Sequence, residues 1–382
     1  MRVTLTCVAA AAGLIHLCQA RAFNQVSLFD TTTKDSNGTW TGVTSGMIAS
    51  AIDAMNTAWY NETDGRWNST TAWWLTGNAL QGVCDYMFKT GDTQYLSQAE
   101  GTIEKQSGPL PWWPEGGGDF RADSTDDTGW WALALVRLFD ITDDSSYLDT
   151  AELDEEYIYS YWNTSTCGGG ILWNIPNLSY KSAISNELYI KLAASLHNRK
   201  PGDTQYLQRA LQVWNWFNAS GMINSADLVN DGLAEGSNGT CTNNGGTTWT
   251  YNQGVVLGGL SELYLATGDK DYLNTAKGIA DAVVSSAALS PSGILTEPCE
   301  STGDCDSNQE AFKGIFTRNL GELNILLADR PYDSYLAHNA RSAWENDRNS
   351  SDYYGLSWAG PYTDATVGTQ SSVISLLVSN IW

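Results

Sequence analysis

Apolar residues recur at the spacing of amphipathic helices along most of this chain, and stretches that alternate in the manner of strands are scarce. This spacing predicts twelve helices, near residues 45–60, 71–89, 94–106, 126–140, 146–162, 182–198, 204–219, 250–267, 271–287, 308–327, 333–347 and 365–381. The pattern therefore predicts an all-α fold.

A short motif recurs four times between the predicted helices, as TGDTQYL at 90–96, TDDSSYL at 142–148, PGDTQYL at 201–207 and TGDKDYL at 267–273. In this motif a glycine can take the left-handed conformation that ends one helix, and the Asp or Thr that follows caps the next helix. The Tyr-Leu pair then begins the buried face of that second helix. Each copy is expected to join two helices, and its recurrence at about 50 to 65 residues is typical of a helical-pair repeat.

Twelve helices joined in this way make six hairpins, which favours a single domain over residues 21–382. Closed into a ring, the hairpins form an (α/α)6 barrel, with inner and outer helices and with long loops at one end that shape a cleft. The alternative that the repeat leaves open is a solenoid of the same hairpins. Glycine-rich loops near 116–118, 167–170 and 245–246 precede expected inner helices or their approach, where loops carry function.

Residues 1–20 have the features of a secretory signal, because an apolar run from Val8 to Leu17 follows Arg2 and leads to small residues suited to cleavage. No later segment reaches about 18 apolar residues, so no transmembrane segment is expected. Residues 371–382 lack the pattern of a glycolipid-anchor signal, which favours free secretion unless the chain is truncated. We therefore expect a secreted protein, extracellular or in a cell wall. Sequons that suit such a product occur at Asn37, Asn61, Asn68, Asn163, Asn177, Asn218, Asn238 and Asn349.

Composition and charge exclude several classes of function. Hydrophobic residues make up 42% and charged residues 16% of the 382 residues, which describes a folded globular chain and not a disordered one. With 20 Lys and Arg against 43 Asp and Glu, the formal net charge is -23, which excludes nucleic acid as a partner. Metal-ligand spacings, phosphate-binding loops and dinucleotide fingerprints are missing from the sequence, so neither a metal nor a cofactor is expected. A monomer is expected.

Cysteine usage predicts two disulfides. Of the seven cysteines, two would leave with the signal, and the five that remain are an odd number, so one thiol is expected to be free. We expect pairs between Cys299 and Cys305 and between Cys167 and Cys241, with Cys84 as a buried thiol in an apolar helical stretch.

Two adjacent carboxylates, Asp126 and Asp127, begin a predicted helix that continues with Trp130 and Trp131. Helical neighbours diverge by about 100°, so the two carboxyl groups can stand roughly 5 Å apart and face one cavity, as in a retaining glycosidase. The helix dipole favours one ionised carboxylate, whereas repulsion and burial raise the pKa of its partner. This is the division between nucleophile and general acid, although the residues alone do not order the two. The alternative is that both are ordinary capping residues.

Aromatic residues with a polar handle are abundant, with 17 Trp and 18 Tyr against 8 Phe. Sugar sites use such rings because the rings combine an apolar face with a polar edge. Aromatic residues gather beside Gly, Asn and Pro at 111–115, 171–174, 249–254 and 353–358, which favours a carbohydrate cleft. His197 and His338 lie in helical patterns away from any Ser or Cys nucleophile, so a Ser-His-Asp or Cys-His enzyme is not expected.

Several of these segments together resemble glycoside hydrolase family 76, whose fungal members are endo-α-1,6-mannanases. The resemblance rests on DDTGWW at 126–131, WTYNQG at 249–254 followed by GGL at 258–260, FKGIF at 312–316, WN at 173–174 and SNEL at 185–188. It implies an (α/α)6 fold and retaining hydrolysis of α-1,6-mannosidic bonds in mannan. By position in the motif, Asp126 would be the nucleophile and Asp127 the acid/base.

Further residues are expected to contact the sugar. Ring contacts are predicted for Trp130, Trp173 and Tyr251. Hydroxyl contacts are predicted for Asn186, Asp231, Asn252, Gln253 and Lys313. Asp231 could equally cap a turn at 230–232, and Lys313 could be a structural ion-pair partner.

Three other functions remain open at this point. Some members of the resembled family are thought to be cell-wall transglycosidases that act on the mannose core of glycolipid-anchored proteins, since water and an acceptor sugar compete for one glycosyl-enzyme. A polysaccharide lyase would need a Tyr or His base and cations that neutralise a uronate. A non-catalytic mannan-binding protein would have no use for two adjacent buried acids.

Overall fold

Helices make up most of the structure, a computed structural model that describes residue 40 and residues 42–382. The α-helices are α2 (Ser45–Trp59), α3 (Trp73–Thr90), α4 (Leu96–Gln106), α5 (Thr125–Thr142), α6 (Ser145–Tyr159), α7 (Ala183–Arg199), α8 (Gln205–Ala219), α9 (Thr250–Thr267), α10 (Lys270–Ser285), α11 (Phe312–Leu326), α12 (Asp333–Asn346) and α13 (Val367–Val378). All twelve predicted helices are therefore confirmed. The signal predicted at 1–20 and the sequon at Asn37 lie outside the described residues.

Short elements occupy the loops between the α-helices. Two antiparallel hairpins pair β1 (Tyr60–Asn61) with β2 (Arg66–Trp67) and β3 (Leu233–Glu235) with β4 (Cys241–Asn243). Short 3-10 helices are η2 (Pro114–Gly116), η3 (Pro291–Gly293), η4 (Pro298–Ser301) and η5 (Gln309–Ala311). The loop that carries η3 and η4 leads to the amino end of α11, and the loop that carries the β3–β4 hairpin leads to the amino end of α9.

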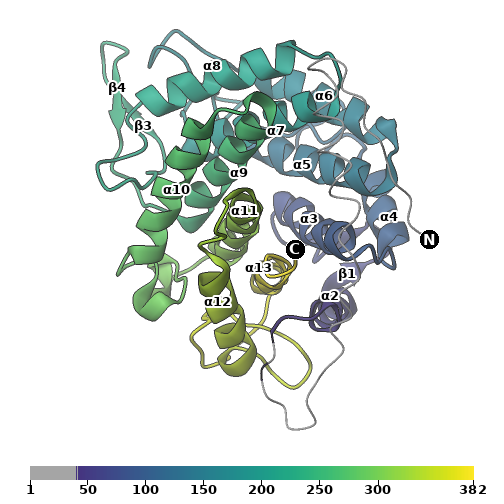
Figure 1. The fold of residues 1–382 in the computed structure, drawn as a ribbon. Coiled ribbons are helices and arrows are strands. Elements are labelled where there is room, and N and C mark those ends of the chain that lie inside the picture. Colours follow the sequence, from purple (N-terminus) through teal and green to yellow (C-terminus); the bar gives the residue numbers. More distant parts are fainter. Residues whose placement is uncertain (1–39, 41) are drawn as a thin grey trace, which may run out of the picture. The chain divides into compact units, whose positions relative to one another are not determined.

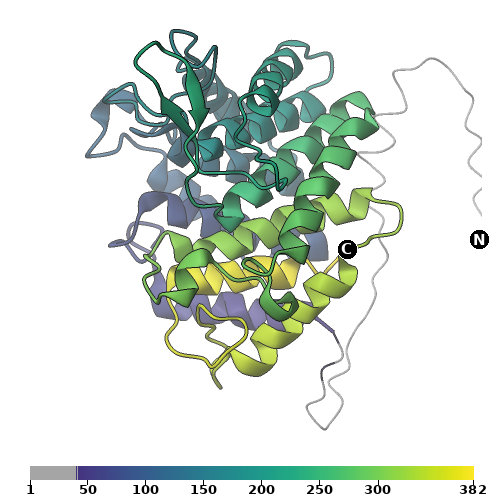
Figure 2. The ribbon, with the colours of Figure 1, turned by 90° about the vertical axis from the view of Figure 1, so that its left-hand side faces the viewer.

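Six helices form a closed inner ring within residues 42–381 (Figure 1). Helix α3 packs on α5, α5 on α7, α7 on α9, α9 on α11 and α11 on α13, and α13 returns to pack on α3. Figure 2 shows the yellow α13 lying beside the green α11. The outer helices α4, α6, α8, α10 and α12 each pack on the inner helix before them, and α2 packs on α13. The fold is therefore the predicted (α/α)6 barrel, and the open solenoid is excluded.

The helices of the inner and outer rings differ in how much of their surface is buried. Helix α13 is buried along its whole length, because α3 and α11 flank it and outer helices cover its remaining side. Outer helix α10 buries only one stripe, made of Leu273, Ala276, Ile279, Ala280 and Val283 at helical spacing. Inner helices approach closely where glycine allows it: a Cβ added to Gly314 would lie 2.4 Å from the Cα atom of Ser372 on α13. The ring closes tightly at that contact.

The repeated motif joins helices as predicted. In all four copies the Asp carboxylate accepts a hydrogen bond from the backbone N–H two residues later, at 3.1 Å for Asp92, 2.9 Å for Asp144, 2.9 Å for Asp203 and 3.0 Å for Asp269. These bonds satisfy amide groups that a helix start leaves without a partner. Gly91 and Gly268 end α3 and α9 in the left-handed conformation, with φ of 72° and 74°.

The cysteine predictions are confirmed. Disulfides join Cys167 to Cys241 and Cys299 to Cys305, and Cys84 is a buried free thiol on α3. The first disulfide ties β4 to the loop before α7, and the second closes a short loop before α11. Within residues 42–382, the helices are too short or too polar to cross a membrane.

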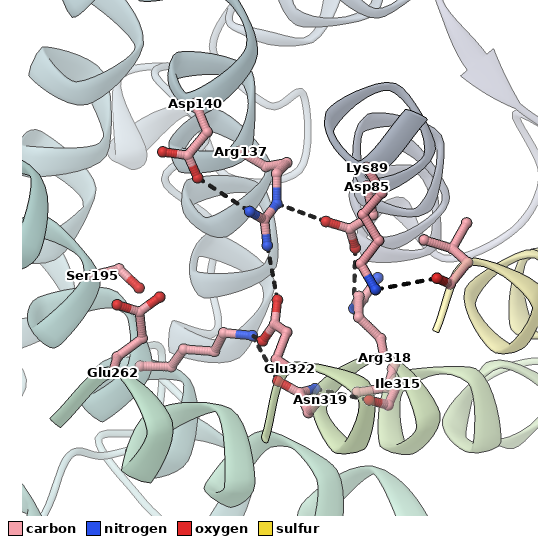
Figure 3. Close-up of polar contacts among 12 residues, drawn as sticks. Asp85, Lys89, Arg137, Asp140, Ser195, Glu262, Ile315, Arg318, Asn319 and Glu322 are labelled. Carbon is pink, nitrogen blue, oxygen red and sulfur yellow. Dashed lines mark hydrogen bonds and ion pairs between the residues drawn. The ribbon is translucent and has the colours of Figure 1, made fainter. Parts of the chain in front are cut away.

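A buried network of charges lies at the carboxyl ends of the inner helices (Figure 3). Arg137 of α5 is its centre, with contacts of 2.6 Å to Asp85, 3.2 Å to Asp140 and 2.8 Å to Glu322. Lys191 of α7 contacts the second oxygen of Glu322 at 2.6 Å. Although burial alone would raise the pKa of Glu322, Lys191 and Arg137 lower that pKa to about 2. The network therefore holds Glu322 ionised inside the barrel.

The direction of the inner helices explains where opposite charges gather. The inner helices run parallel, so their amino ends share one end of the barrel and their carboxyl ends share the other. Partial positive charge accumulates at the first end and partial negative charge at the second. The arginine and lysine side chains of the network lie at the second end. At the first end, carboxylates line a cavity.

Candidate active site

A cavity of about 490 Å³ opens at the amino ends of five inner helices. Its walls contain the residues Ala72, Trp74, Asp123, Ser124, Asp126, Asp127, Trp130, Trp173, Asn174, Tyr180, Ser182, Ile184, Asp231, Trp249, Tyr251, Asp306, Asn308, Gln309 and Phe312. Carboxylates and aromatic rings dominate this set. Among the described residues that line the cavity, none is Lys, Arg or His.

Asp126 and Asp127 occupy the first turn of α5, as predicted, and both face the cavity. The loop at 171–175 holds this turn in place: the backbone N–H of Thr125 donates to the Trp173 carbonyl at 3.2 Å, and the Thr125 hydroxyl donates to the Leu172 carbonyl at 2.9 Å. The Ile175 N–H donates to the carbonyl of residue 123 at 3.1 Å. The two carboxylates therefore stand on a rigid helix start and not on a free loop.

The two carboxyl groups have unequal environments. Burial raises the pKa of Asp126, and hydrogen bonds from Ser124 and the Trp173 side chain partly offset that rise. Burial also raises the pKa of Asp127, to well above its usual range, and the charges of Asp126 and Asp123 add to the effect. Burial and the neighbouring charges therefore favour a proton on Asp127 over one on Asp126.

Aromatic rings form one continuous wall of the cavity. Tyr251 stacks on Phe312 with ring centroids 3.8 Å apart and an angle of 6° between the planes. The ring centroid of Trp130 lies 6.5 Å from that of Tyr251 and 5.4 Å from that of Trp74. The indole N–H of Trp74 donates to the side chain of Asn308 at 2.9 Å, which fixes that ring at the edge of the wall. Such a wall suits the apolar faces of sugar rings.

Six of the predicted site residues meet at this cavity. They are Asp126, Asp127, Trp130, Trp173, Asp231 and Tyr251. Neither Asn186 nor Gln253 lies among the lining residues. The Asn186 amide is bonded to the backbone of Ile171 and Ser182, at 2.9 and 2.8 Å, and the Gln253 amide is bonded to both backbone groups of Val229 at 2.7 Å. The amides of these two residues therefore hold loops in place outside the cavity lining, and the hydroxyl contacts stay predictions.

Lys313 and Asn252 also lie outside the cavity lining. Lys313 is buried, with its ammonium group 2.7 Å from Glu300, 2.6 Å from the Leu356 carbonyl and 4.7 Å from the centre of the Trp358 ring. The structural ion-pair alternative therefore describes Lys313, which anchors the loop that leads to the cavity residues at 306–309. Asn252 is fully buried, and its amide has no hydrogen-bond partner among the described residues.

Several cavity residues were not predicted. Trp74 and Phe312 follow the apolar spacing of inner helices, so their sequence context is that of core residues. Tyr180 and Asp306 lie in loops, and Asn308 and Gln309 lie at the start of the helix predicted over 308–327, all without a distinctive motif. The available clue was topological, because each of these residues lies near the start of an inner helix.

The defining sequence pattern of glycosyl hydrolase family 76 matches residues 39–381. This chain belongs to glycosyl hydrolase family 76. A relative from Schizosaccharomyces pombe is 32% identical over 288 residues, which are 70% of this chain and 64% of the relative. The mannan endo-1,6-alpha-mannosidase DFG5 of Saccharomyces cerevisiae is 28% identical over 366 residues, which are 91% of this chain and 78% of DFG5.

Solved structures of family 76 share the fold. The α-1,6-mannanase GH76A of Salegentibacter sp. HEL1_6 superimposes with a TM-score of 0.78 at 23% identity, covering 88% of this chain and 98% of that one. Dfg5 of Chaetomium thermophilum, solved in complex with glucosamine, has a TM-score of 0.75 at 21% identity, covering 88% and 89%. The family 76 architecture thus extends over nearly all of the described residues.

Proposed function

We propose that this protein is a secreted, retaining endo-glycosidase that cleaves α-1,6-mannosidic bonds in mannan. The observation that carries the proposal is the pair Asp126 and Asp127, held on one helix turn with unequal affinity for a proton, in a cavity walled by aromatic rings. The names of the fungal relatives support the substrate. An inactive Salegentibacter mannanase, with two adjacent aspartates replaced by asparagine, was solved with α-1,6-mannotriose, which supports both substrate and pair.

In the proposed mechanism, Asp126 attacks the anomeric carbon of a mannosyl unit while Asp127 transfers its proton to the leaving glycosidic oxygen. A covalent glycosyl-enzyme forms as the glycosidic bond breaks. Asp127, now ionised, takes a proton from water, and that water displaces Asp126 from the anomeric carbon. Two inversions give net retention. Trp130, Trp173 and Tyr251 would contact sugar rings, and Asp231 would accept a hydrogen bond from a hydroxyl.

The test is product analysis on linear α-1,6-mannan. We expect shortened α-1,6-mannose oligomers whose new reducing ends start as the α anomer, as observed by proton NMR within the first minutes. Products that start as the β anomer would contradict the mechanism. Unsaturated products, detected by ultraviolet absorbance, would indicate a lyase, which the lack of cations on the described cavity walls disfavours. Binding without products would indicate a mannan-binding protein.

Transfer to a sugar acceptor is the second function to test, because an acceptor hydroxyl can replace water at the same glycosyl-enzyme. The fungal relatives DFG5 and DCW1 are the reason to include it. Repeating the reaction with added α-1,6-mannobiose should reveal longer products if transfer dominates and only shorter ones if hydrolysis does. The two disulfides and the sequons support action outside the cell, after removal of residues 1–20.

Activity should follow a bell-shaped dependence on pH. It should fall as pH drops through the pKa of Asp126, since the nucleophile must be ionised, and fall again as pH rises through the pKa of Asp127, since the acid must hold its proton. Because burial raises both values, both limbs should lie above the ordinary carboxyl pKa of about 4. The measurement is kcat/KM on α-1,6-mannan from pH 3 to 10. A plateau that continues to the highest pH would contradict Asp127 as the acid.

A further inference from the structure

Tyr180 and Asp231 form a linked pair on one wall of the cavity. Both residues line the cavity, and they come from different loops. The Tyr180 hydroxyl donates a short hydrogen bond to Asp231 Oδ2 and accepts one from the Asn244 side-chain amide at 3.0 Å. Asp231 was predicted as a sugar contact, whereas the other two residues were not.

Backbone contacts fix the position of Asp231. Its carbonyl accepts from the N–H of Ala183, the first residue of α7, at 2.8 Å. The carbonyl of the next residue, Gly232, accepts a hydrogen bond from the backbone N–H of Asn244 at 3.0 Å, at the end of the β3–β4 hairpin. The disulfide at Cys241 ties this hairpin to the loop before α7. The main chain on both sides of the pair is thus held firmly.

The local backbone is shaped around the Tyr180 ring. Tyr180 has φ of 65°, a left-handed conformation that is costly for a residue with a bulky side chain. A Cβ atom added to Gly232 would lie 2.5 Å from the Tyr180 hydroxyl oxygen, so only glycine leaves room for it. Trp173 packs against the Tyr180 ring edge to face, with ring centroids 6.3 Å apart. The backbone N–H of Trp173 donates to the Tyr180 carbonyl at 2.7 Å. Tyr180 is therefore held in a strained backbone conformation that places its hydroxyl in contact with Asp231.

The hydrogen-bonding capacity of the pair defines what it can bind. The Tyr180 hydroxyl uses its one proton on Asp231 and one lone pair on Asn244, so one lone pair remains. Asp231 Oδ1 has no hydrogen bond to the described part of the protein. The pair therefore offers acceptors only, and a matching ligand must present hydroxyl donors side by side. Two hydroxyls on adjacent ring carbons of a pyranose meet that need.

We propose that Tyr180 fixes Asp231, and that Asp231 Oδ1 and the tyrosine hydroxyl together accept hydrogen bonds from a vicinal diol of one mannosyl unit. This inference rests on the proposed function and adds the group through which the sugar is recognised. An α-1,6-linked mannosyl unit keeps its hydroxyls at positions 2, 3 and 4 free. Without Tyr180, Asp231 would lose the bond that holds one of its oxygens and could turn away from the diol.

The test is Tyr180→Phe, which removes one hydroxyl and keeps the ring. On linear α-1,6-mannan, kcat/KM should fall by about tenfold to a hundredfold, the range expected when a hydrogen bond to a charged group is lost. The matched control is Tyr159→Phe, which removes a hydroxyl bonded to Gln212 at 3.0 Å between outer helices. It should change kcat/KM by less than about twofold. If wild type cleaves mannan and the kcat/KM of Tyr180→Phe equals that of wild type, this inference is overturned and the proposed function is not.

A double-mutant cycle separates positioning from a general structural effect. In an Asp231→Asn background, Tyr180→Phe should cost less than it does in wild type, because the carboxylate that it positions is already gone and only its own contact with the diol is lost. An equal loss in both backgrounds would show that Tyr180 does not act through Asp231. If Tyr180→Phe fails to fold, Asn244→Ala takes its place and should lower kcat/KM by about threefold only when Asp231 is present. A wild-type protein that neither binds nor cleaves α-1,6-mannan would overturn the proposed function and this inference together.

Discussion

Asp126→Asn should lower the rate of α-1,6-mannan cleavage by at least about a thousandfold while the protein stays folded, because Asp126 is the proposed nucleophile and an amide cannot form the glycosyl-enzyme. Asn has nearly the same shape as Asp, so the loops that surround the first turn of α5 should not move. Unfolding by urea should therefore need at least as much denaturant as for wild type. Burial penalises the charged form of Asp126, so its removal relieves a cost of folding.

Asp127→Asn should also abolish mannan cleavage, but for a different reason that kinetics can separate. Its proton is needed by a poor leaving group such as a sugar hydroxyl, and much less by an aryl leaving group that is stable as an anion. An aryl α-1,6-mannobioside should therefore still react rapidly with the Asp127 variant in a first burst, and not with the Asp126 variant. The reverse pattern would exchange the two roles. Full mannan cleavage by either variant would remove that residue from the mechanism.

Asp123→Asn is the matched control for this pair. Asp123 lines the same cavity and lies just before α5, and its charge raises the pKa of Asp127. Its loss should lower the pKa of Asp127 and move the alkaline limb of the pH profile to lower pH, since one of the charges that favour the proton is gone. Maximal activity should fall by less than about tenfold. Abolition of activity would give Asp123 a direct part in the chemistry.

The helices and their joints could be predicted from sequence because both depend on short-range physics. Each joint needs one Asp whose carboxylate reaches an amide two residues away, so the motif is visible within seven letters of sequence. Closure of the ring is different. It depends on α13 packing on α3, between segments nearly three hundred residues apart, and the resemblance to a family supplied that conclusion where the repeat left a choice.

Asp126 and Asp127, the proposed catalytic pair, could be located in the cavity from sequence because two adjacent acids followed by two tryptophans begin a predicted helix. The residues that contact the sugar were harder to predict. A helix turns by about 100° per residue, so a motif does not say which of its side chains faces the cavity. Tyr251 faces it, whereas its neighbours Asn252 and Gln253 do not. Phe312 and Lys313 show the same contrast at the start of α11: the aromatic residue lines the cavity and the lysine was the one predicted.

The charge network at the far end of the barrel could not be predicted either, because its members come from separate inner helices. Arg137 and the catalytic pair share α5 but lie about ten residues apart, which is roughly 15 Å along the helix. The cavity carboxylates lie at the amino ends of the inner helices, whose partial charge is opposite to theirs, whereas the far end holds basic residues together with their carboxylate partners. Stability and catalysis are therefore expected to respond to different substitutions on one helix.

Arg137→Ala should destabilise the protein by about 3–5 kcal/mol, the cost of breaking a buried ion pair by removing one partner. Three carboxylates, Asp85, Asp140 and Glu322, would lose a contact at once, and Asp85, whose side chain is only 5% exposed, is the least able to reach water instead. The measurement is the free energy of unfolding from urea titration. Because total stability is commonly about 5–15 kcal/mol, such a loss should be visible as a much lower midpoint.

Arg341→Ala is the matched control, since Arg341 pairs with Glu345 on the exposed side of α12 at 3.0 Å, and it should cost less than about 1 kcal/mol. Arg137→Ala combined with Glu322→Gln should recover part of the loss, because one of the stranded charges is then removed. The fraction of Arg137→Ala protein that remains folded should cleave mannan at nearly the wild-type rate, as the substitution lies far from the cavity. A loss below about 1 kcal/mol would mean that water or a neighbouring lysine replaces the guanidinium, and that ring closure rests on apolar packing alone.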